Sequence, residues 1–161
     1  VGSEMCIRDR RYLALDVGDR RVGVAVSDKM GLIATPLTVV HRKSKVEDFA
    51  KVARLMREQD ASVLVIGQPL NADGSVGPQA ARIERYAHAL MKALSKEGLE
   101  VTMIFWDEYL STQRAQQAMI SAGLRSKDRR MQIDAAAAAV ILQDYLDVQR
   151  PDRPAPMEEV N

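Results

Sequence analysis

Cysteine, histidine and aromatic residues are scarce in this chain of 161 residues. The single cysteine, Cys6, rules out an internal disulfide and a thiolate metal cluster, which fits a reducing environment. The two histidines, His41 and His88, are not at a spacing that suits one metal ion. Aromatic residues make up 4% of the chain, which argues against an extensive base-stacking platform. These shortages leave carboxylates as the main candidates for metal ligands.

Long hydrophobic runs and an excess of one charge are also missing. No apolar run approaches the roughly 18 residues that cross a membrane, so we expect a soluble protein with no membrane partner. The 23 basic and 22 acidic residues give a formal charge of +1, so any binding of nucleic acid must come from local clusters. The length favours one domain with a substantial core.

The two ends differ in character from the rest of the chain. Residues 1–10 show neither a clear period nor signal-peptide architecture, and we interpret them as a non-native or disordered leader. Residues 151–161 carry three prolines among charged residues and are predicted to be a disordered tail. The folded domain is therefore predicted over residues 11–150.

Within this domain the hydrophobic pattern predicts strands first and then alternating helices and strands. Three β-rich segments joined by short turns predict an antiparallel meander over residues 12–17, 22–28 and 33–41. The pattern then predicts a helix at 46–56, a strand at 62–67, a helix from Pro78 to before Gly98, a strand at 100–106, and helices at 110–122 and 132–148. This order predicts an α/β fold with a mixed five-stranded sheet and helices on its faces.

Asp16 is an acidic residue inside an apolar strand, between Leu15 and Val17. Burying an unpaired charge costs several kcal/mol, so a metal ion, a phosphate held through a metal, or a cation from elsewhere is expected beside it. Gly18 and Gly23 permit close approach of backbone or ligand, or a positive φ in the turn. The alternative is an edge hairpin in which Asp16 is solvated.

Two more acidic positions fall where the predicted fold converges. Asp107 and Glu108 follow an apolar strand, and alternation lets at most one of them face a given site. Their alternative role is to cap the next helix. Asp134 precedes five alanines, a thin surface that lets the last helix lie close to the sheet. Its alternative role is to satisfy the helix dipole from the first turn.

The three acids Asp16, Glu108 and Asp134 favour a hard cation, Mg²⁺ or Mn²⁺, over zinc. Two such ions about 4 Å apart activate a water and stabilise the leaving oxygen of a phosphodiester. This chemistry predicts a metal-dependent nuclease.

Several motifs in order resemble the YqgF family, also called RuvX, of pre-16S rRNA nucleases and Holliday-junction resolvase homologues. The resemblance covers roughly residues 11–150. The motifs are Ala14-Leu-Asp-Val-Gly18 with Val22-Gly-Val-Ala-Val26, Gly67-Gln-Pro-Leu-Asn-Ala-Asp-Gly74, Asp107-Glu-Tyr-Leu-Ser-Thr112 and Ile133-Asp-Ala-Ala-Ala137.

The resemblance implies a ribonuclease H-like fold, a cytoplasmic bacterial protein and a role in maturing the 5′ end of 16S ribosomal RNA. It also implies that Asp16, Glu108 and Asp134 are the acidic site residues. Tyr109 stands where the family usually has Arg, which puts in doubt any phosphate contact expected from that Arg. In such a sheet the strand before Asp107 lies two positions from that of Asp16, about 10 Å away. Gly67, on the strand between, leaves room for Glu108 to reach across.

Basic residues near these acids are the candidates for nucleic-acid contacts. A predicted loop over residues 125–130 precedes Asp134, and two arginines follow Asp16. The candidate residues are Arg20, Arg21, Asn71, Arg114, Arg125, Lys127, Arg129 and Arg130. Such charged runs are also common on simply solvated surfaces.

The expected partner is structured RNA, such as pre-16S rRNA within a pre-ribosomal particle, or branched DNA, bound by a monomer or a homodimer. Junction resolution ordinarily requires a symmetric dimer. A nucleic-acid adaptor without catalytic activity is a further alternative. ATP binding of the actin or sugar-kinase type is disfavoured, because those proteins need two such lobes and this chain has no Gly-rich phosphate loop.

Overall fold

The computed structural model describes residues 10–107 and 126–149, with the side chains of the last helix described from Gln132 onward. Five strands and three helices make up this part of the chain. The strands are β1 (Arg11–Val17), β2 (Arg21–Ser27), β3 (Ala34–His41), β4 (Ala61–Gln68) and β5 (Thr102–Asp107). The helices are α2 (Lys45–Glu58), α3 (Pro78–Lys96) and α5 (Ser126–Gln149). None of the described helices combines the length and apolar character that crossing a membrane requires.

The strands form one mixed sheet in the order β3-β2-β1-β4-β5. β1 pairs antiparallel with β2, and β2 with β3, which confirms the predicted meander. β4 pairs parallel with β1 on one side and with β5 on the other. β5 therefore lies two positions from β1, as expected. Because β1 is central, the alternative of an edge hairpin around Asp16 is wrong.

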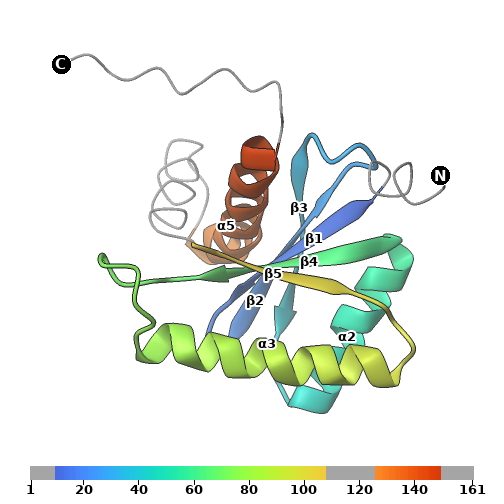
Figure 1. The fold of residues 1–161 in the computed structure, drawn as a ribbon, viewed down its shortest axis with the longest axis horizontal. Coiled ribbons are helices and arrows are strands. Elements are labelled where there is room, and N and C mark those ends of the chain that lie inside the picture. The colour runs from blue at the N-terminus through green and yellow to red at the C-terminus, as the bar shows by residue number, and fades with distance from the viewer. Residues whose placement is uncertain (1–9, 108–125, 150–161) are drawn as a thin grey trace.

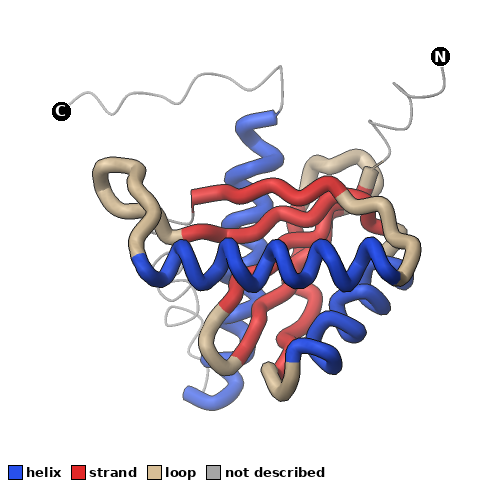
Figure 2. Tube along the Cα trace, turned by 60° about the horizontal axis from the view of Figure 1, so that its bottom comes forward, coloured by secondary structure: helices blue, strands red, loops and turns tan. Residues whose placement is uncertain are grey.

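The helices cover both faces of the sheet (Figures 1 and 2). α2 and α3 lie on one face, where they pack with Leu13, Leu15 and Val17 of β1. α5 crosses the other face, where it packs with Ala14. Alternation along a strand sends successive side chains to opposite faces, so β1 contributes to both layers.

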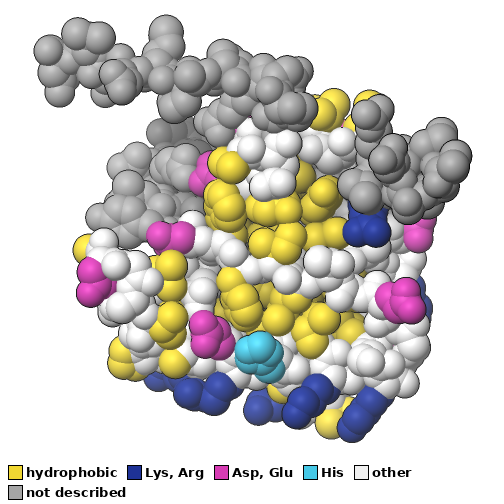
Figure 3. Space-filling model, in the orientation of Figure 1, with side chains coloured by type: hydrophobic (Ala, Val, Ile, Leu, Met, Phe, Trp, Pro, Cys, Tyr) yellow, Lys and Arg dark blue, Asp and Glu magenta, His cyan; other side chains and the backbone are white. Residues whose placement is uncertain are grey.

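α2 and α3 begin and end at the signals that the sequence carries. Ser44 caps α2, because its hydroxyl accepts a hydrogen bond from the Glu47 backbone N–H at 3.2 Å. Pro78 occupies the first turn of α3, and Gly98 follows its end with φ of +79°. Lys and Arg side chains gather along the side of the molecule where α3 lies (Figure 3).

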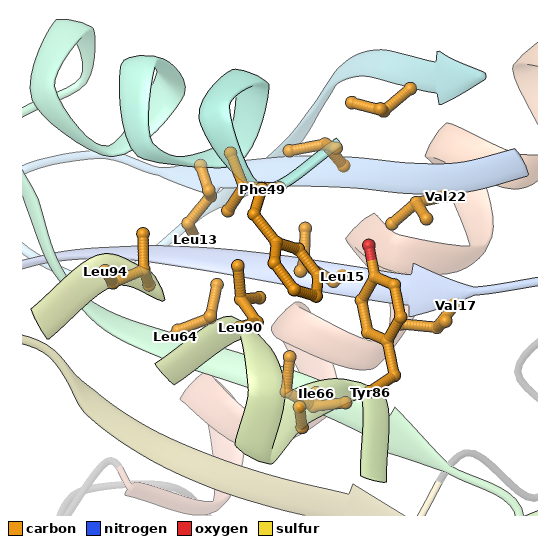
Figure 4. Packing of buried hydrophobic residues seen from close by; sticks show 14 of the residues in the cluster. Leu13, Leu15, Val17, Val22, Phe49, Leu64, Ile66, Tyr86, Leu90 and Leu94 are labelled. Atoms are coloured by element: carbon orange, nitrogen blue, oxygen red, sulfur yellow. The ribbon is translucent and has the colours of Figure 1, made fainter. Parts of the chain in front are cut away.

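The larger core lies between the sheet and the helix pair α2 and α3. Phe49 of α2 packs edge-on against Tyr86 of α3, with ring centroids 5.2 Å apart. Leu15 and Leu90 are fully buried beside them (Figure 4). Burying a large aliphatic side chain contributes about 1.5–3 kcal/mol, so this layer supplies much of the free energy of folding.

α5 begins earlier than predicted. The sequence analysis placed its start at residue 132 and assigned residues 125–130 to a loop, but the helix runs from Ser126. Lys and Arg favour helices, but the segment lacks the apolar period that predicts one. Asp134 is consequently not in the first turn, and its predicted alternative role in satisfying the helix dipole there is wrong.

Candidate active site

The carboxyl ends of β1, β4 and β5 lie at one edge of the sheet, because these three strands are parallel. Ligands commonly bind at this edge in sheets of this type. Asp16 is the penultimate residue of β1, and Gly67 and Asp107 lie near the ends of β4 and β5. The edge therefore brings together residues from three of the predicted motifs.

Asp16 faces α5. Its neighbour two residues earlier, Ala14, belongs to the cluster packed on α5, while Leu15 and Val17 belong to the opposite layer. Asp16 pairs across the sheet with Gly23 of β2 and is half-buried. Cross-strand partners share a face of the sheet, so the missing side chain of Gly23 leaves space directly beside the Asp16 carboxylate.

The backbone of Asp134 occupies the space above Gly23. A Cβ atom added to Gly23 would overlap the carbonyl oxygen of Asp134 and lie 3.1 Å from the backbone nitrogen of Ala135. The following alanines allow this approach, since Ala138 is fully buried in the cluster that α5 forms with the sheet. The predicted close contact between the alanine run and the sheet is confirmed. Asp16 and Asp134 are consequently neighbours across one glycine.

The role of the glycines differs in one respect from the prediction. Among the described glycines, positive φ values occur at Gly31, Gly74 and Gly98, and not at Gly18 or Gly23. Gly18 closes a tight turn instead: its N–H donates to the Arg21 carbonyl oxygen at 2.9 Å, and an added Cβ would lie 2.8 Å from that oxygen. Both positions need glycine because backbone atoms of other residues lie where a side chain would be.

Arg21 is paired with Asp134. Its Nε donates to Oδ2 of the carboxylate at 2.5 Å, and the two side chains are 32% and 25% exposed. Arg21 lies two residues from Gly23 on the same strand and therefore faces α5 as well. The guanidinium holds the Asp134 carboxylate at the edge and offsets its charge. A phosphate bound by Arg21 would have to share the guanidinium with this carboxylate.

Asp107 lies at the end of β5, on the opposite face from Trp106. Trp106 packs edge-on against Tyr145 of α5, with ring centroids 5.4 Å apart, and Phe105 belongs to the other layer. Asp107 is exposed. Glu108, Tyr109, Arg114 and Arg125, which the sequence analysis singled out, lie outside the described residues.

The remaining predicted contacts are spread along the same edge. Arg20 is exposed in the turn after β1, and its carbonyl oxygen accepts from the Arg42 N–H at 2.8 Å. The Asn71 side chain donates to the Ser75 hydroxyl at 2.9 Å and is engaged within its own loop. The backbone places three further candidates in α5 before Asp134: Lys127, Arg129 and Arg130.

Arg42 is a residue that the sequence analysis missed. Its Nη1 donates to the Gly18 carbonyl oxygen at 2.7 Å, so it braces the turn that follows Asp16. The contact spans 24 positions in the sequence, and no local motif marks it. Pairing of β2 with β3, which ends at His41, brings Arg42 to this turn.

Two described carboxylates, Asp16 and Asp134, could contribute oxygen ligands to a cation. Within residues 10–107 and 126–149 no three His, Cys, Asp or Glu side chains form a group that could hold a metal ion. The third acid of the prediction, Glu108, falls outside those residues. Carboxylate oxygens suit Mg²⁺ or Mn²⁺, so the donors that are described fit such an ion.

Comparison with known proteins agrees with this arrangement. The family model described as "RuvX: Holliday junction resolvase" matches residues 10–148. The chain belongs to the RuvX family. The resemblance inferred from the motifs is thereby confirmed.

Individual RuvX relatives and one solved structure extend the comparison. A Synechococcus protein is 46% identical over 138 residues, which cover 86% of this chain and 78% of the relative. A Thermoanaerobacter pseudethanolicus protein is 38% identical over 141 residues, which cover 87% of this chain and 98% of the relative. Both are named "Putative pre-16S rRNA nuclease".

The solved structure is T. thermophilus RuvC in complex with a Holliday junction substrate. It matches with a TM-score of 0.51 at 17% identity, over 86% of this chain and 94% of that one. This likeness shows the fold. The mixed sheet with helices on both faces is ribonuclease H-like, as predicted.

Proposed function

We propose that this RuvX protein is a divalent-metal-dependent nuclease that acts in the cytoplasm on the 5′ end of pre-16S rRNA. The observation that carries the proposal is the packing of Asp134 over Gly23, the cross-strand partner of Asp16. This packing supports a site shared by two carboxylates from segments more than 100 residues apart, at the end of the sheet where ligands commonly bind. The names of the relatives support pre-16S rRNA as the substrate.

Asp16, Asp134 and Glu108 are the proposed ligands of Mg²⁺ or Mn²⁺. When bound, the metal supplies an activated water and stabilises the leaving oxygen of the phosphodiester. The protein's own part is to hold the carboxylates in place. β1 fixes Asp16 from the centre of the sheet, and the ion pair with Arg21 orients Asp134. We propose Glu108 as the third ligand because Trp106, two residues before it, faces α5.

Contacts to substrate phosphates are proposed for the basic residues around this edge. Arg20 is exposed beside the Asp16 turn, and Lys127, Arg129 and Arg130 precede Asp134 on α5. Arginine and lysine at such positions orient a nucleic-acid backbone without reading its sequence. Asn71, Arg114 and Arg125 complete the proposed set.

Holliday-junction cleavage is the second candidate function. It is favoured by the description of the matching family and by the likeness of fold to RuvC. The two candidates share the acidic site and differ in substrate and assembly, because a resolvase acts as a symmetric dimer on two strands. They are therefore separated by substrate preference and by oligomeric state.

The test compares cleavage of a precursor 16S RNA and of a four-way DNA junction by the same preparation, with Mg²⁺ or Mn²⁺. We expect cleavage of the precursor RNA that chelation abolishes. Asp16→Asn and Asp134→Asn should each lower the single-turnover rate by about 10³-fold, since removing a metal ligand costs roughly 4 kcal/mol of transition-state stabilisation. Circular dichroism should show that both variants remain folded.

Asp60→Asn is the matched control for these variants. Asp60 precedes β4 at the opposite edge of the sheet, and its φ of +52° is one that Asn adopts readily. This variant should cleave at the wild-type rate. Wild-type rates in both Asp16→Asn and Asp134→Asn at saturating metal would contradict the shared site. Cleavage of the junction alone, by a dimer, would favour the second candidate.

A further inference from the structure

A pocket of about 300 Å³ lies at the same edge of the sheet, on the face that carries α2 and α3. The end of β1 and the turn after it form one wall, the first turns of α3 form another, and Arg42 follows β3. The pocket is lined by residues that include Val17, Gly18, Asp19, Arg42, Arg82 and Tyr86. The acidic site lies on the α5 side of β1 and does not include this pocket.

Arg42 is held in place at the pocket. Its guanidinium lies 4.9 Å from the centroid of the Tyr86 ring, and Nη1 donates to the Gly18 carbonyl oxygen at 2.7 Å. Its backbone N–H donates to the Arg20 carbonyl oxygen at 2.8 Å. A guanidinium has five N–H donors in a fixed fork, so this anchoring leaves donors for a further partner.

Tyr86 gives the pocket a buried polar group. The residue is 4% exposed, and its hydroxyl has no hydrogen-bond partner among the described residues. Figure 4 shows the ring rising from α3 beside Val17 and Phe49. Burial raises the pKa of Tyr86 to about 12, so the hydroxyl stays protonated. Buried polar groups without a partner are uncommon and indicate an unassigned interaction.

Arg82 is the second cation of the pocket. It is exposed on α3, and its side chain makes no hydrogen bond or ion pair with any other described residue. With Asp19 as the one carboxylate of the lining, the two arginines leave a net charge of +1. A phosphodiester carries one negative charge and accepts hydrogen bonds from arginine in a fixed geometry. The volume, at the lower end of the range for ligand pockets, suits a phosphate with part of its sugar.

We propose that this pocket binds a backbone phosphate of the nucleic-acid substrate, through Arg42 and Arg82, at a distance from the bond that is cleaved. The inference rests on the proposed function for the identity of the ligand. Val17 lines the pocket and directly follows Asp16, and the two side chains face opposite sides of β1. A strand of nucleic acid that crosses the edge of the sheet therefore reaches both the pocket and the acidic site.

The test measures binding of a fluorescently labelled precursor 16S RNA in EDTA, where no cleavage occurs, as a function of salt. Arg82→Gln should weaken binding about tenfold, because it removes a charge-assisted contact. The slope of log K against log[salt] should fall by about 0.7–0.9, the value for one lost phosphate contact. Since the Arg82 side chain has no partner in the described part of the chain, the melting temperature should stay unchanged.

Arg85→Gln is the matched control. Arg85 is also an exposed arginine of α3, one turn further on, and it does not line the pocket. It should keep wild-type affinity and slope. Arg42→Lys, which retains the charge but loses the fork, should weaken binding in the same direction as Arg82→Gln. Equal losses in Arg82→Gln and Arg85→Gln would indicate a diffuse basic surface on α3 and overturn the proposal.

The outcomes separate this inference from the proposed nuclease function. If the protein cleaves no RNA but binds it in a way that depends on Arg82, phosphate binding by the pocket is supported and the nuclease assignment is contradicted. If the wild-type protein cleaves RNA but Arg42→Lys and Arg82→Gln bind it with unchanged affinity and slope, the pocket does not bind a substrate phosphate. The nuclease assignment would then stay intact. Failure of the wild-type protein to bind the RNA in EDTA would overturn the proposal that the pocket binds a phosphate.

Discussion

The two faces of β1 and β2 carry side chains of different size. On the α2 and α3 face, β1 and β4 present large residues that are fully buried, among them Leu13, Leu15, Leu64 and Ile66. On the α5 face, Ala14, Ala25 and Gly23 form a strip of small residues, and the larger Val65 and Trp106 lie on the neighbouring strands. Large apolar side chains stabilise through buried area, whereas small ones let two backbones approach closely. Both faces bury large side chains, but only the strip of small residues on the second face lets α5 approach the sheet this closely.

Proximity explains why polar groups gather on the α5 face. Asp16, Arg21 and Asp134 all lie where α5 meets the end of the sheet. The hairpin between β2 and β3 is also held from this side, because the Gln143 amide of α5 donates to the Leu32 carbonyl oxygen at 3.0 Å. Substitutions on the two faces should therefore affect different properties.

The largest difference is expected at the two neighbouring acids. Asp107 follows Trp106, which faces α5, and Glu108 is the proposed metal ligand. Glu108→Gln should slow single-turnover cleavage at high Mg²⁺ by about 10³-fold. Asp107→Asn should lose only roughly 1–2 kcal/mol of transition-state stabilisation. Circular dichroism checks the fold. A larger loss in Asp107→Asn would reverse the assignment, and mild losses in both would make the pair a helix cap.

Truncation on the other face should lower stability and leave the site intact. Leu64→Ala removes a fully buried side chain between the sheet and α2 and α3, so the free energy of unfolding should fall by about 3 kcal/mol. Urea denaturation measures the loss. Leu32→Ala, where the side chain is 39% exposed, is the control and should cost less than about 1 kcal/mol. The folded fraction of Leu64→Ala should cleave at the wild-type rate. A loss of activity in that fraction would contradict the expectation that substitutions on this face leave the site intact.

Gly23→Ala tests the close approach on the α5 face. The added methyl overlaps the backbone of Asp134, so α5 must move outward, at a cost of about 2 kcal/mol in unfolding free energy. Cleavage should fall as well, because Asp134 moves away from Asp16. Gly77→Ala is the control for the free energy of unfolding, since its nearest neighbour is the movable Asn71 side chain at 3.1 Å. Unchanged stability and cleavage in Gly23→Ala would show that this contact does not position the site.

The smallest effect is expected at Asp28 in the β2–β3 hairpin. Partial burial raises the pKa of the Asp28 carboxyl, but hydrogen bonds from the N–H groups of Ile33, Leu32 and Met30 outweigh it and hold the pKa below its usual value. Asp28→Asn should cost roughly 0.5 kcal/mol at neutral pH, because exposure screens the carboxylate. The lowered pKa means that this stability is present above the unfolded pKa and is lost as pH falls through the folded one. The urea midpoints of the wild type and Asp28→Asn should converge below about pH 4. A difference that does not change with pH would show that the charge on Asp28 is not its cause.

Local signals predicted the elements of the fold well. β-rich segments joined by short turns predicted β1 and β2, a short apolar run predicted β4, and Pro78 and Gly98 predicted the two ends of α3. The start of α5 was predicted wrongly because its first residues carry charge instead of an apolar period. Residue types that suit both a helix and a solvated loop leave such a boundary undetermined.

The sequence by itself determined the chemistry that this protein offers: carboxylates in apolar surroundings, glycines beside them, and an alanine run after Asp134. Tertiary structure alone decided which groups meet. The overlap of Asp134 with the space above Gly23, the ion pair across 113 positions between Arg21 and Asp134, and the contact of Arg42 with Gly18 depend on strand order and helix placement. Periodicity reports which face a residue occupies, whereas contacts between distant segments arise from packing the whole chain.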